Sequence, residues 1–403
     1  MWGKGERALR VSTRTTTKRT MPSDVNDEKT HREYDDEEED GRGGHVLFCG
    51  EEFPSGFESC KRHAMPFGLA IHTCPRDDVK RWIQRYDVAV PLMTRVDEDV
   101  LEGDDKKGGG GKLKLVLQFG VGLEGVSIEA LTRRHVKVGR IRSDKTPNAQ
   151  STAEMGVFLT LAALKRANEC RTSVLRRTLG APMGDSLFGA HVLFIGFGRV
   201  AKAQARMMKR GFGCKIFALV RRKKGGEGKR EEDNEEEEEE DKALLEDTFE
   251  GDISNVDFVG RFPSEGNNVV VVACTCTREN RKMVNDHFIE QLKFGEKRVP
   301  GIVVNVARGA LVDERAMRMA CDSGKVLYYA TDVCFEEPVD VDGDLLGPDE
   351  NGKRASNIFV TPHVGGVTVN SYEKMGKIIA EYAAKIVNEK KEIESDECVS
   401  IVN

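Results

Sequence analysis

The chain has 403 residues, 39% of them hydrophobic, so it can bury a large core, and its length suggests two or three domains. The formal net charge of −6 is unevenly spread, with acidic runs at residues 35–40 and 231–241 and six Lys/Arg against one Glu in residues 1–20. No apolar run approaches the roughly 18 residues of a membrane span. We therefore expect neither a membrane nor a nucleic acid as a partner.

The ten cysteines include no CxxC pair and read as reduced thiols of an intracellular protein, so we expect no metal site. Residues 1–20 are basic and Thr-rich, which is typical of an organelle transit peptide. There are two alternatives: the protein starts at Met21, or residues 1–20 are a disordered basic tail. The sequence thus predicts a cytoplasmic or organellar protein whose residues 1–43 are disordered.

Strand-like runs alternate with more helical stretches in the first part of the chain. The expected strands are 45–50, 87–93, 113–120 and 136–141. This alternation predicts a parallel α/β layer. Residues 103–112, GDDKKGGGGK, have linker composition and predict a mobile surface loop.

A long helix is expected to begin at Ser151, because Ser151 and Glu154 have capping-box spacing and the following residues are apolar on most faces. Such a helix should be buried between two units. A second α/β series follows, with strands expected at 191–196, 214–220, 269–274, 301–307, 326–333 and 357–362. We interpret the acidic run 227–242 as a solvated insertion with no fold of its own, and residues 371–390 as a final helix.

The motif GFGRVA begins with Gly196, directly after a strand, and opens a helix. Gly196 and Gly198 would let the backbone approach a pyrophosphate, while the helix beginning near Arg199 and Val200 supplies free N–H groups. The third glycine of the fingerprint is Ala201, which the pattern allows. The order of strand, turn and helix favours dinucleotide binding over a bare tight turn.

The next strand ends in LVRRKK, where an NAD site normally carries an acid for the ribose 2′-hydroxyl. From Arg199 to Gly226 there is no acid, against ten Lys/Arg. Arg221 and Arg222 stand where a 2′-phosphate would lie. The sequence therefore favours NADP over NAD, the alternative being a basic helix face and a solvated loop.

Three further residues follow the carboxyl ends of expected strands, where open α/β sheets place ligands: Arg308, Glu337 and His363. Taken singly, each has a structural explanation. Together they suit hydride reduction of a 2-keto acid. Histidine donates the proton to the new alkoxide, a carboxylate orients the imidazole, and the planar arginine fork binds the keto oxygen and carboxylate.

The chain resembles the D-isomer-specific 2-hydroxyacid dehydrogenases over roughly residues 45–390, through GFGRVA, NVARGALVDE and the series TDV, EEP and TPHVGG. The resemblance implies that Arg308, Glu337 and His363 are the catalytic trio, with Glu337 chosen because it directly precedes Pro338.

The resemblance also implies roles for other residues. Asp332 would contact the nicotinamide carboxamide, the N–H groups of Val121 and Gly122 would hold the substrate carboxylate together with Arg308, and residues 148–154 would form the hinge. The implied cofactor-binding set is Gly196, Gly198, Arg199, Val200, Arg221, Arg222, Thr277, Ala307, Asp332 and Gly365.

The family layout implies an α/β fold of two Rossmann-like or flavodoxin-like doubly wound parallel-sheet domains separated by an active-site cleft. Residues 44–149, completed by 364–403, would bind substrate. Residues 150–363 would bind the dinucleotide and carry the acidic insert 227–242. Family members are usually homodimers paired through their cofactor domains, so we expect a homodimer.

The sequence departs from the family pattern at several places. Glu124 replaces an aspartate of the substrate loop, and Thr275-Cys276-Thr277 replaces a Pro-Leu-Thr turn. The acidic insert could oppose NADP, although screening over about 8–10 Å limits this effect. Residues 340–357 make a long loop.

The sequence thus favours an NADP(H)-preferring oxidoreductase that interconverts a small 2-keto acid, such as glyoxylate or hydroxypyruvate, and a D-2-hydroxy acid. The alternative is a nucleotide-sensing, corepressor-like interaction protein on the same scaffold. Formate dehydrogenases resemble the chain but pair their histidine with glutamine. Phosphoglycerate oxidation is a further possibility, although no regulatory domain is expected after residue 390.

Overall fold

The computed structural model describes residues 45–102, 111–221, 240, 242–251, 268–292, 301–349 and 351–403. The expected N-terminal tail, most of the loop 103–112, Arg222 and most of the insert 227–242 lie outside these residues. In the described part of the chain, no helix is long and apolar enough to cross a membrane.

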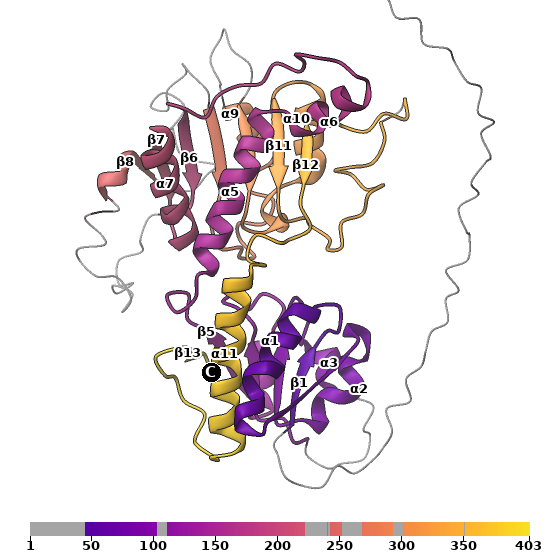
Figure 1. The fold of residues 1–403 in the computed structure, drawn as a ribbon, viewed down its shortest axis with the longest axis vertical. Coiled ribbons are helices and arrows are strands. Elements are labelled where there is room, and N and C mark those ends of the chain that lie inside the picture. Colours follow the sequence, from indigo (N-terminus) through magenta and orange to yellow (C-terminus); the bar gives the residue numbers. More distant parts are fainter. Residues whose placement is uncertain are drawn as a thin grey trace, which may run out of the picture. The chain divides into compact units, whose positions relative to one another are not determined.

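The first sheet has six strands in the order β13-β5-β4-β3-β1-β2. Figure 1 labels β1, β5 and β13 of this sheet. Its strands are β1 His45–Cys49, β2 Ala70–Cys74, β3 Val88–Pro91, β4 Leu115–Gln118, β5 Lys137–Ile141 and β13 Val399–Ile401. Strands β2-β1-β3-β4-β5 are mutually parallel in the flavodoxin order, and β13 joins β5 antiparallel. The four strands expected here are confirmed, whereas β2 and β13 were not expected.

The second sheet has seven parallel strands in the order β12-β11-β10-β9-β6-β7-β8. They are β6 His191–Ile195, β7 Lys215–Val220, β8 Leu245–Glu250, β9 Asn268–Val272, β10 Ile302–Asn305, β11 Tyr328–Thr331 and β12 Ile358–Val360. The strand order reverses between β6 and β9, as in a Rossmann fold. All six expected strands are confirmed, and β8 is an addition. The predicted class of two doubly wound parallel-sheet domains is therefore confirmed.

Helices cover both sheets. They are α1 Pro54–Ala64, α2 Val79–Trp82, α3 Glu98–Glu102, α4 Ile128–Arg133, α5 Asn148–Leu164, α6 Ala167–Leu175, α7 Arg199–Phe212, α9 Asp286–Gln291, α10 Glu314–Asp322 and α11 Val369–Val387. The expected final helix is α11, which packs with α1 over the first sheet. One core cluster there joins residues 46–141 to residues 372–399. This is the packing that an N-terminal domain completed by the C-terminal segment requires, although the expected domain borders stay a prediction.

The start of α5 differs from the prediction. The helix begins at Asn148 after Pro147, and Ser151 lies inside its first turn instead of capping it. Proline suits a helix start because its fixed φ is already helical. The Ser151 hydroxyl instead lies 2.9 Å from the Thr368 hydroxyl, at the start of α11.

The second sheet is apolar on both faces. Successive strand residues point to opposite faces, so Leu193 and Val270 join one cluster while Phe194 and Val271 join the other. The helix α5 packs on the second of these faces through Leu159 and its neighbours. Burial on both faces explains the continuous apolar strand runs of the sequence and gives the strand ends a rigid support.

Candidate functional site

Three strand ends meet at one edge of the second sheet. In the strand register Asn305 pairs with Thr331, and Thr331 with Val360, so β10, β11 and β12 finish side by side. Arg308 follows β10 by three residues and His363 follows β12 by three. The predicted clustering of strand-end side chains is therefore present in the structure.

His363 and Glu337 form a direct pair, with 2.7 Å between Nδ1 and Oε2. The other Glu337 oxygen accepts the Cys334 N–H at 3.0 Å. Burial raises the pKa of Glu337. The hydrogen bond and charge of His363, the Cys334 N–H and the Arg308 charge together outweigh that effect and bring the pKa below its ordinary value. Because Nδ1 is engaged, the imidazole has Nε2 left for a ligand.

Asp332 fixes the loop that carries His363. It is only 2% exposed, and its Oδ1 accepts bonds from the Thr361 hydroxyl at 2.6 Å and the Val364 N–H at 2.9 Å. Its Oδ2 accepts the Gly365 N–H at 2.7 Å, and its backbone oxygen accepts the His363 N–H at 2.8 Å. A Cβ on Gly365 would lie 2.7 Å from Oδ2. Sequence reasoning assigned Asp332 only a nicotinamide contact, which stays a prediction, and missed this positioning.

Arg308 forms an ion pair with Glu124, with 3.3 Å between Nε and Oε1 and 3.4 Å between Nη2 and Oε2. Its Nη1 donates to the Ala307 oxygen at 2.7 Å. A Cβ on Gly122 would lie 2.5 Å from Nη2 of Arg308, so the guanidinium rests on the loop expected to bind substrate. The sequence marked Glu124 as a departure from the family pattern but gave no sign of this contact.

The backbone around Arg308 is held from two sides. The buried Asn305 side chain donates to the Arg308 oxygen at 3.0 Å and accepts the Ala307 N–H at 3.0 Å. A Cβ on Gly309 would lie 1.9 Å from the carbonyl carbon of Cys334, so only glycine fits between these two loops. The loops bearing Arg308 and Glu337 therefore pack backbone against backbone.

The substrate loop expected at Val121 and Gly122 follows β4. Among the described residues, neither of these two N–H groups donates to a protein acceptor, whereas the Gly120 N–H donates to Gln118. Both residues are partly exposed. The arrangement agrees with the expectation that these N–H groups receive a carboxylate, a role that stays a prediction.

The GFGRVA turn fits a dinucleotide. Gly196 has φ +87°, and a Cβ there would lie 2.5 Å from the Cβ of Cys274, so glycine is required. A Cβ on Gly198 would meet no atom within 4 Å, which leaves open space above the start of α7 at Arg199. The first N–H groups of a helix lack intrahelical partners and attract anions. Val200 packs partly buried against the core beneath the turn.

The loop after β9 borders the same edge. The Thr277 N–H donates to Asn280 at 2.7 Å, which orders the turn where the family pattern has Pro-Leu-Thr. The pKa of Glu279 is lowered first by its hydrogen bond with the Thr277 side chain, and further by the charges of Arg221 and Arg278. Arg221 is exposed and directly follows β7. Sequence reasoning missed Glu279, whose pKa the charge of this arginine helps to lower.

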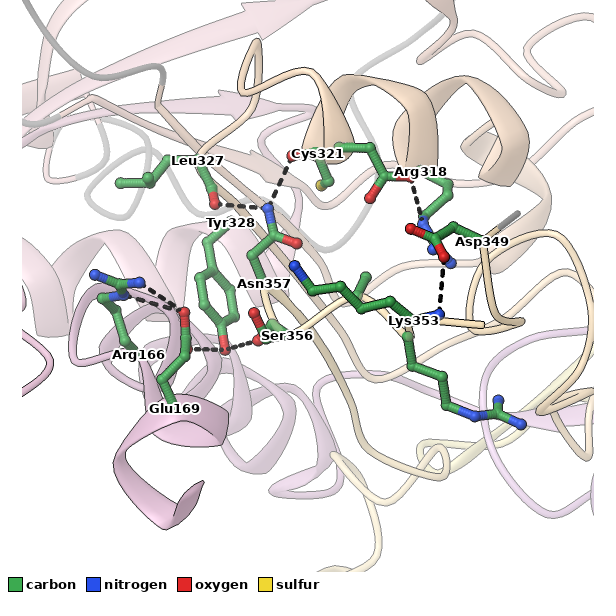
Figure 2. A pocket seen from close by; sticks show the side chains of 13 residues that line it. Arg166, Glu169, Arg318, Cys321, Leu327, Tyr328, Asp349, Lys353, Ser356 and Asn357 are labelled. Atoms are coloured by element: carbon green, nitrogen blue, oxygen red, sulfur yellow. Dashed lines mark hydrogen bonds and ion pairs between the residues drawn. The ribbon is translucent and has the colours of Figure 1, made fainter. Parts of the chain in front are cut away.

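A cavity of about 390 Å³ lies elsewhere, at the amino ends of β11 and β12 (Figure 2). Tyr328 begins β11, and its hydroxyl donates to the Ser356 oxygen at 2.9 Å. Arg166 and Glu169 pair across 2.9 Å, as the dashed lines in Figure 2 show. This cavity is at the sheet edge opposite to His363, and the bond between Tyr328 and Ser356 anchors the end of the long loop 340–357 to the sheet.

Comparison with known proteins agrees with the geometry. Residues 157–250 and 265–365 match the family model of the D-isomer specific 2-hydroxyacid dehydrogenase, NAD binding domain. A glyoxylate reductase of Thermococcus kodakarensis is 28% identical over 342 residues, covering 81% of this chain and 88% of that protein. The chloroplastic D-3-phosphoglycerate dehydrogenase 2 of Arabidopsis thaliana is 28% identical over 313 residues, covering 76% of this chain but only 43% of that protein. The structure of apo D-lactate dehydrogenase from Escherichia coli shares the fold, with a TM-score of 0.63, 17% identity and coverage of 86% of this chain and 98% of that chain.

The chain belongs to the D-isomer specific 2-hydroxyacid dehydrogenase family. It is accordingly an oxidoreductase with a nicotinamide dinucleotide cofactor, as the sequence predicted.

Proposed function

We propose that the protein is an NADP(H)-preferring reductase that interconverts a small 2-keto acid, such as glyoxylate or hydroxypyruvate, and a D-2-hydroxy acid. The observation that carries the proposal is the His363–Glu337 pair at 2.7 Å beside Arg308. The similarity to a glyoxylate reductase supports the substrate class.

Each side chain of the site has a distinct chemical role in this proposal. Arg308 holds the carboxylate and keto oxygen with guanidinium N–H groups, helped by the N–H groups of Val121 and Gly122. His363 donates its Nε2 proton to the oxygen that becomes the alkoxide. Glu337 fixes the imidazole through Nδ1 and stabilises the protonated ring. The bound dihydronicotinamide supplies the hydride.

The cofactor preference is proposed from the end of β7. Arg221 stands there, exposed, in place of the acid that would hold a ribose 2′-hydroxyl. The remaining cofactor-binding assignments, at Thr277, Ala307, Asp332 and Gly365, rest on the family resemblance and on their places at the carboxyl edge of the sheet.

The proposal is tested by following NADPH and NADH oxidation with a panel of 2-keto acids that includes glyoxylate and hydroxypyruvate. We expect turnover of at least one of these acids and a higher kcat/KM with NADPH. Absence of turnover with every 2-keto acid rejects the reductase, and a higher kcat/KM with NADH rejects the cofactor preference alone. The corepressor-like alternative gains no support from the matched proteins named above.

The assembly we propose is a homodimer. A row of large apolar side chains on and after α6 is 74% to 98% exposed. These residues are Val174, Leu175, Leu179, Met183 and Phe188. Large apolar side chains that gather on the surface usually mark a protein interface, and these five lie within fifteen consecutive residues. The row belongs to the part of the chain that precedes β6, which agrees with pairing through the cofactor domain.

A further inference from the structure

The ion pair between Arg308 and Glu124 leaves only part of the guanidinium for a ligand. Nε and Nη2 each face one Glu124 oxygen, and Nη1 donates to Ala307. A guanidinium has five N–H donors. Two of them are used in hydrogen bonds, from Nη2 to Glu124 and from Nη1 to Ala307, so one N–H remains on each terminal nitrogen. These two donors can reach the carboxylate and the keto oxygen of one substrate, which is the role proposed for Arg308 above.

Glu124 also neutralises the positive charge that Arg308 brings to the site. The two side chains are 39% and 41% exposed, so the pair is in contact with solvent. Gly122 leaves room for both groups, because a Cβ there would lie 2.4 Å from Oε2 of Glu124 and 2.5 Å from Nη2 of Arg308. A substrate held by Arg308 therefore lies next to a fixed carboxylate.

The consequence depends on how many charges the substrate carries. When the substrate has one carboxylate as its only anionic group, the arginine donors bind its whole negative charge. A phosphate on the same short molecule adds roughly −1.5 to −2 charge near neutral pH. A three-carbon acid is shorter than the screening length of about 8 Å at physiological salt, so that charge stays within range of Glu124. The repulsion penalises the phosphorylated substrate.

We propose that Glu124 determines the charge class of the substrate, favouring 2-keto acids with the carboxylate as their only anionic group over phosphorylated ones. The inference rests on the proposed function and deepens it. It separates two activities found among the relatives, glyoxylate reduction and phosphoglycerate oxidation.

The test compares the wild-type chain with Glu124→Gln, which removes the charge at equal length, and Glu124→Asp, which keeps the charge. Calorimetry with saturating cofactor measures the dissociation constants of oxamate, a monoanion, and of 3-phosphoglycerate. We expect Glu124→Gln to shift the affinity ratio toward 3-phosphoglycerate about tenfold, which corresponds to about 1.4 kcal/mol. Glu124→Asp should keep the wild-type ratio, and the shift should shrink in 1 M salt, where the screening length is about 3 Å.

An unchanged affinity ratio in Glu124→Gln overturns the inference. An equal shift in both variants also overturns it, because Glu124→Asp keeps the negative charge. Failure of the wild-type chain to bind either anion overturns it too. The expected ratios without turnover of any 2-keto acid support charge selection and reject the reductase.

Discussion

At the scale of single residues, Glu337 links the electrostatics of the site to pH. Its folded-state pKa lies below the ordinary value of 4.5, so its charge stabilises the fold above that pH. That contribution disappears as the pH falls through the lowered folded value. Glutamine does not titrate, so replacing Glu337 by Gln removes the contribution at every pH.

We therefore expect Glu337→Gln to lose about 1–2 kcal/mol of unfolding free energy near pH 7. The loss should shrink below about pH 4. Urea unfolding at pH 7, 5 and 3.5 measures the difference from wild type. A loss that stays constant, or grows in acid, contradicts the lowered pKa. In the proposed reductase, kcat should also fall roughly 10²-fold because the imidazole loses its charged partner.

Arg308 gives a second prediction at this scale. Removing a donor that stabilises a developing oxyanion costs about 2–4 kcal/mol of transition-state stabilisation. Arg308→Ala should therefore lower kcat/KM by roughly 30- to 1,000-fold, since each 1.36 kcal/mol is tenfold. Steady-state kinetics measures the loss. Arg308→Lys keeps the charge without the planar guanidinium, so its kcat/KM should lie between those of the wild type and Arg308→Ala. A near-normal rate for Arg308→Ala removes this residue from the mechanism.

At the scale of elements, two glycines in loops at the same sheet edge should respond in different ways. A Cβ on Gly309 would overlap the backbone of Cys334, whereas a Cβ on Gly198 would meet nothing within 4 Å. Gly309→Ala should cost about 1–3 kcal/mol of stability, because the two loops must move apart. Gly198→Ala should keep the stability within about 0.5 kcal/mol but weaken the cofactor, whose pyrophosphate needs the open backbone.

Thermal melting without cofactor and fluorescence titration of NADPH separate the two effects. Each variant is the matched control of the other, since both add one methyl group at the same sheet edge. If Gly309→Ala melts at the same temperature as the wild type, the backbone contact with Cys334 is contradicted. Unchanged NADPH affinity in Gly198→Ala contradicts the placement of the pyrophosphate.

Element by element, the sequence predicted the buried strands and missed three of the four edge strands. β6, β9 and β10 are apolar on both faces, so their runs are continuous and recognisable. The three strands that were not expected, β2, β8 and β13, each end a sheet. An edge strand buries fewer side chains. The exposed acids of β8 also make its sequence look like a continuation of the acidic run before it.

The candidate site likewise has a part that could be predicted from the sequence and a part that could not. Arg308, Glu337 and His363 were predictable because parallel strands end at one edge, which is a property of the chain order. The contacts of Glu124 with Arg308 and of Gly309 with Cys334 join residues from different loops. Such contacts depend on the tertiary path of the chain, which leaves no local pattern in the sequence.

At the scale of the whole molecule, the exposed apolar row after α6 predicts the assembly. Leu179 and Met183 are 98% and 88% exposed, so their replacement by Asp removes little packing within one chain. The double variant should sediment as a monomer of 44.8 kDa with an unchanged melting temperature at high dilution, while the wild type sediments at twice that mass. Met65→Asp, a 65% exposed apolar position on another element, should remain a dimer and so controls for the added charge. Sedimentation equilibrium at micromolar concentration measures both masses. A monomeric wild type rejects the homodimer, and a dimeric double variant places its interface elsewhere.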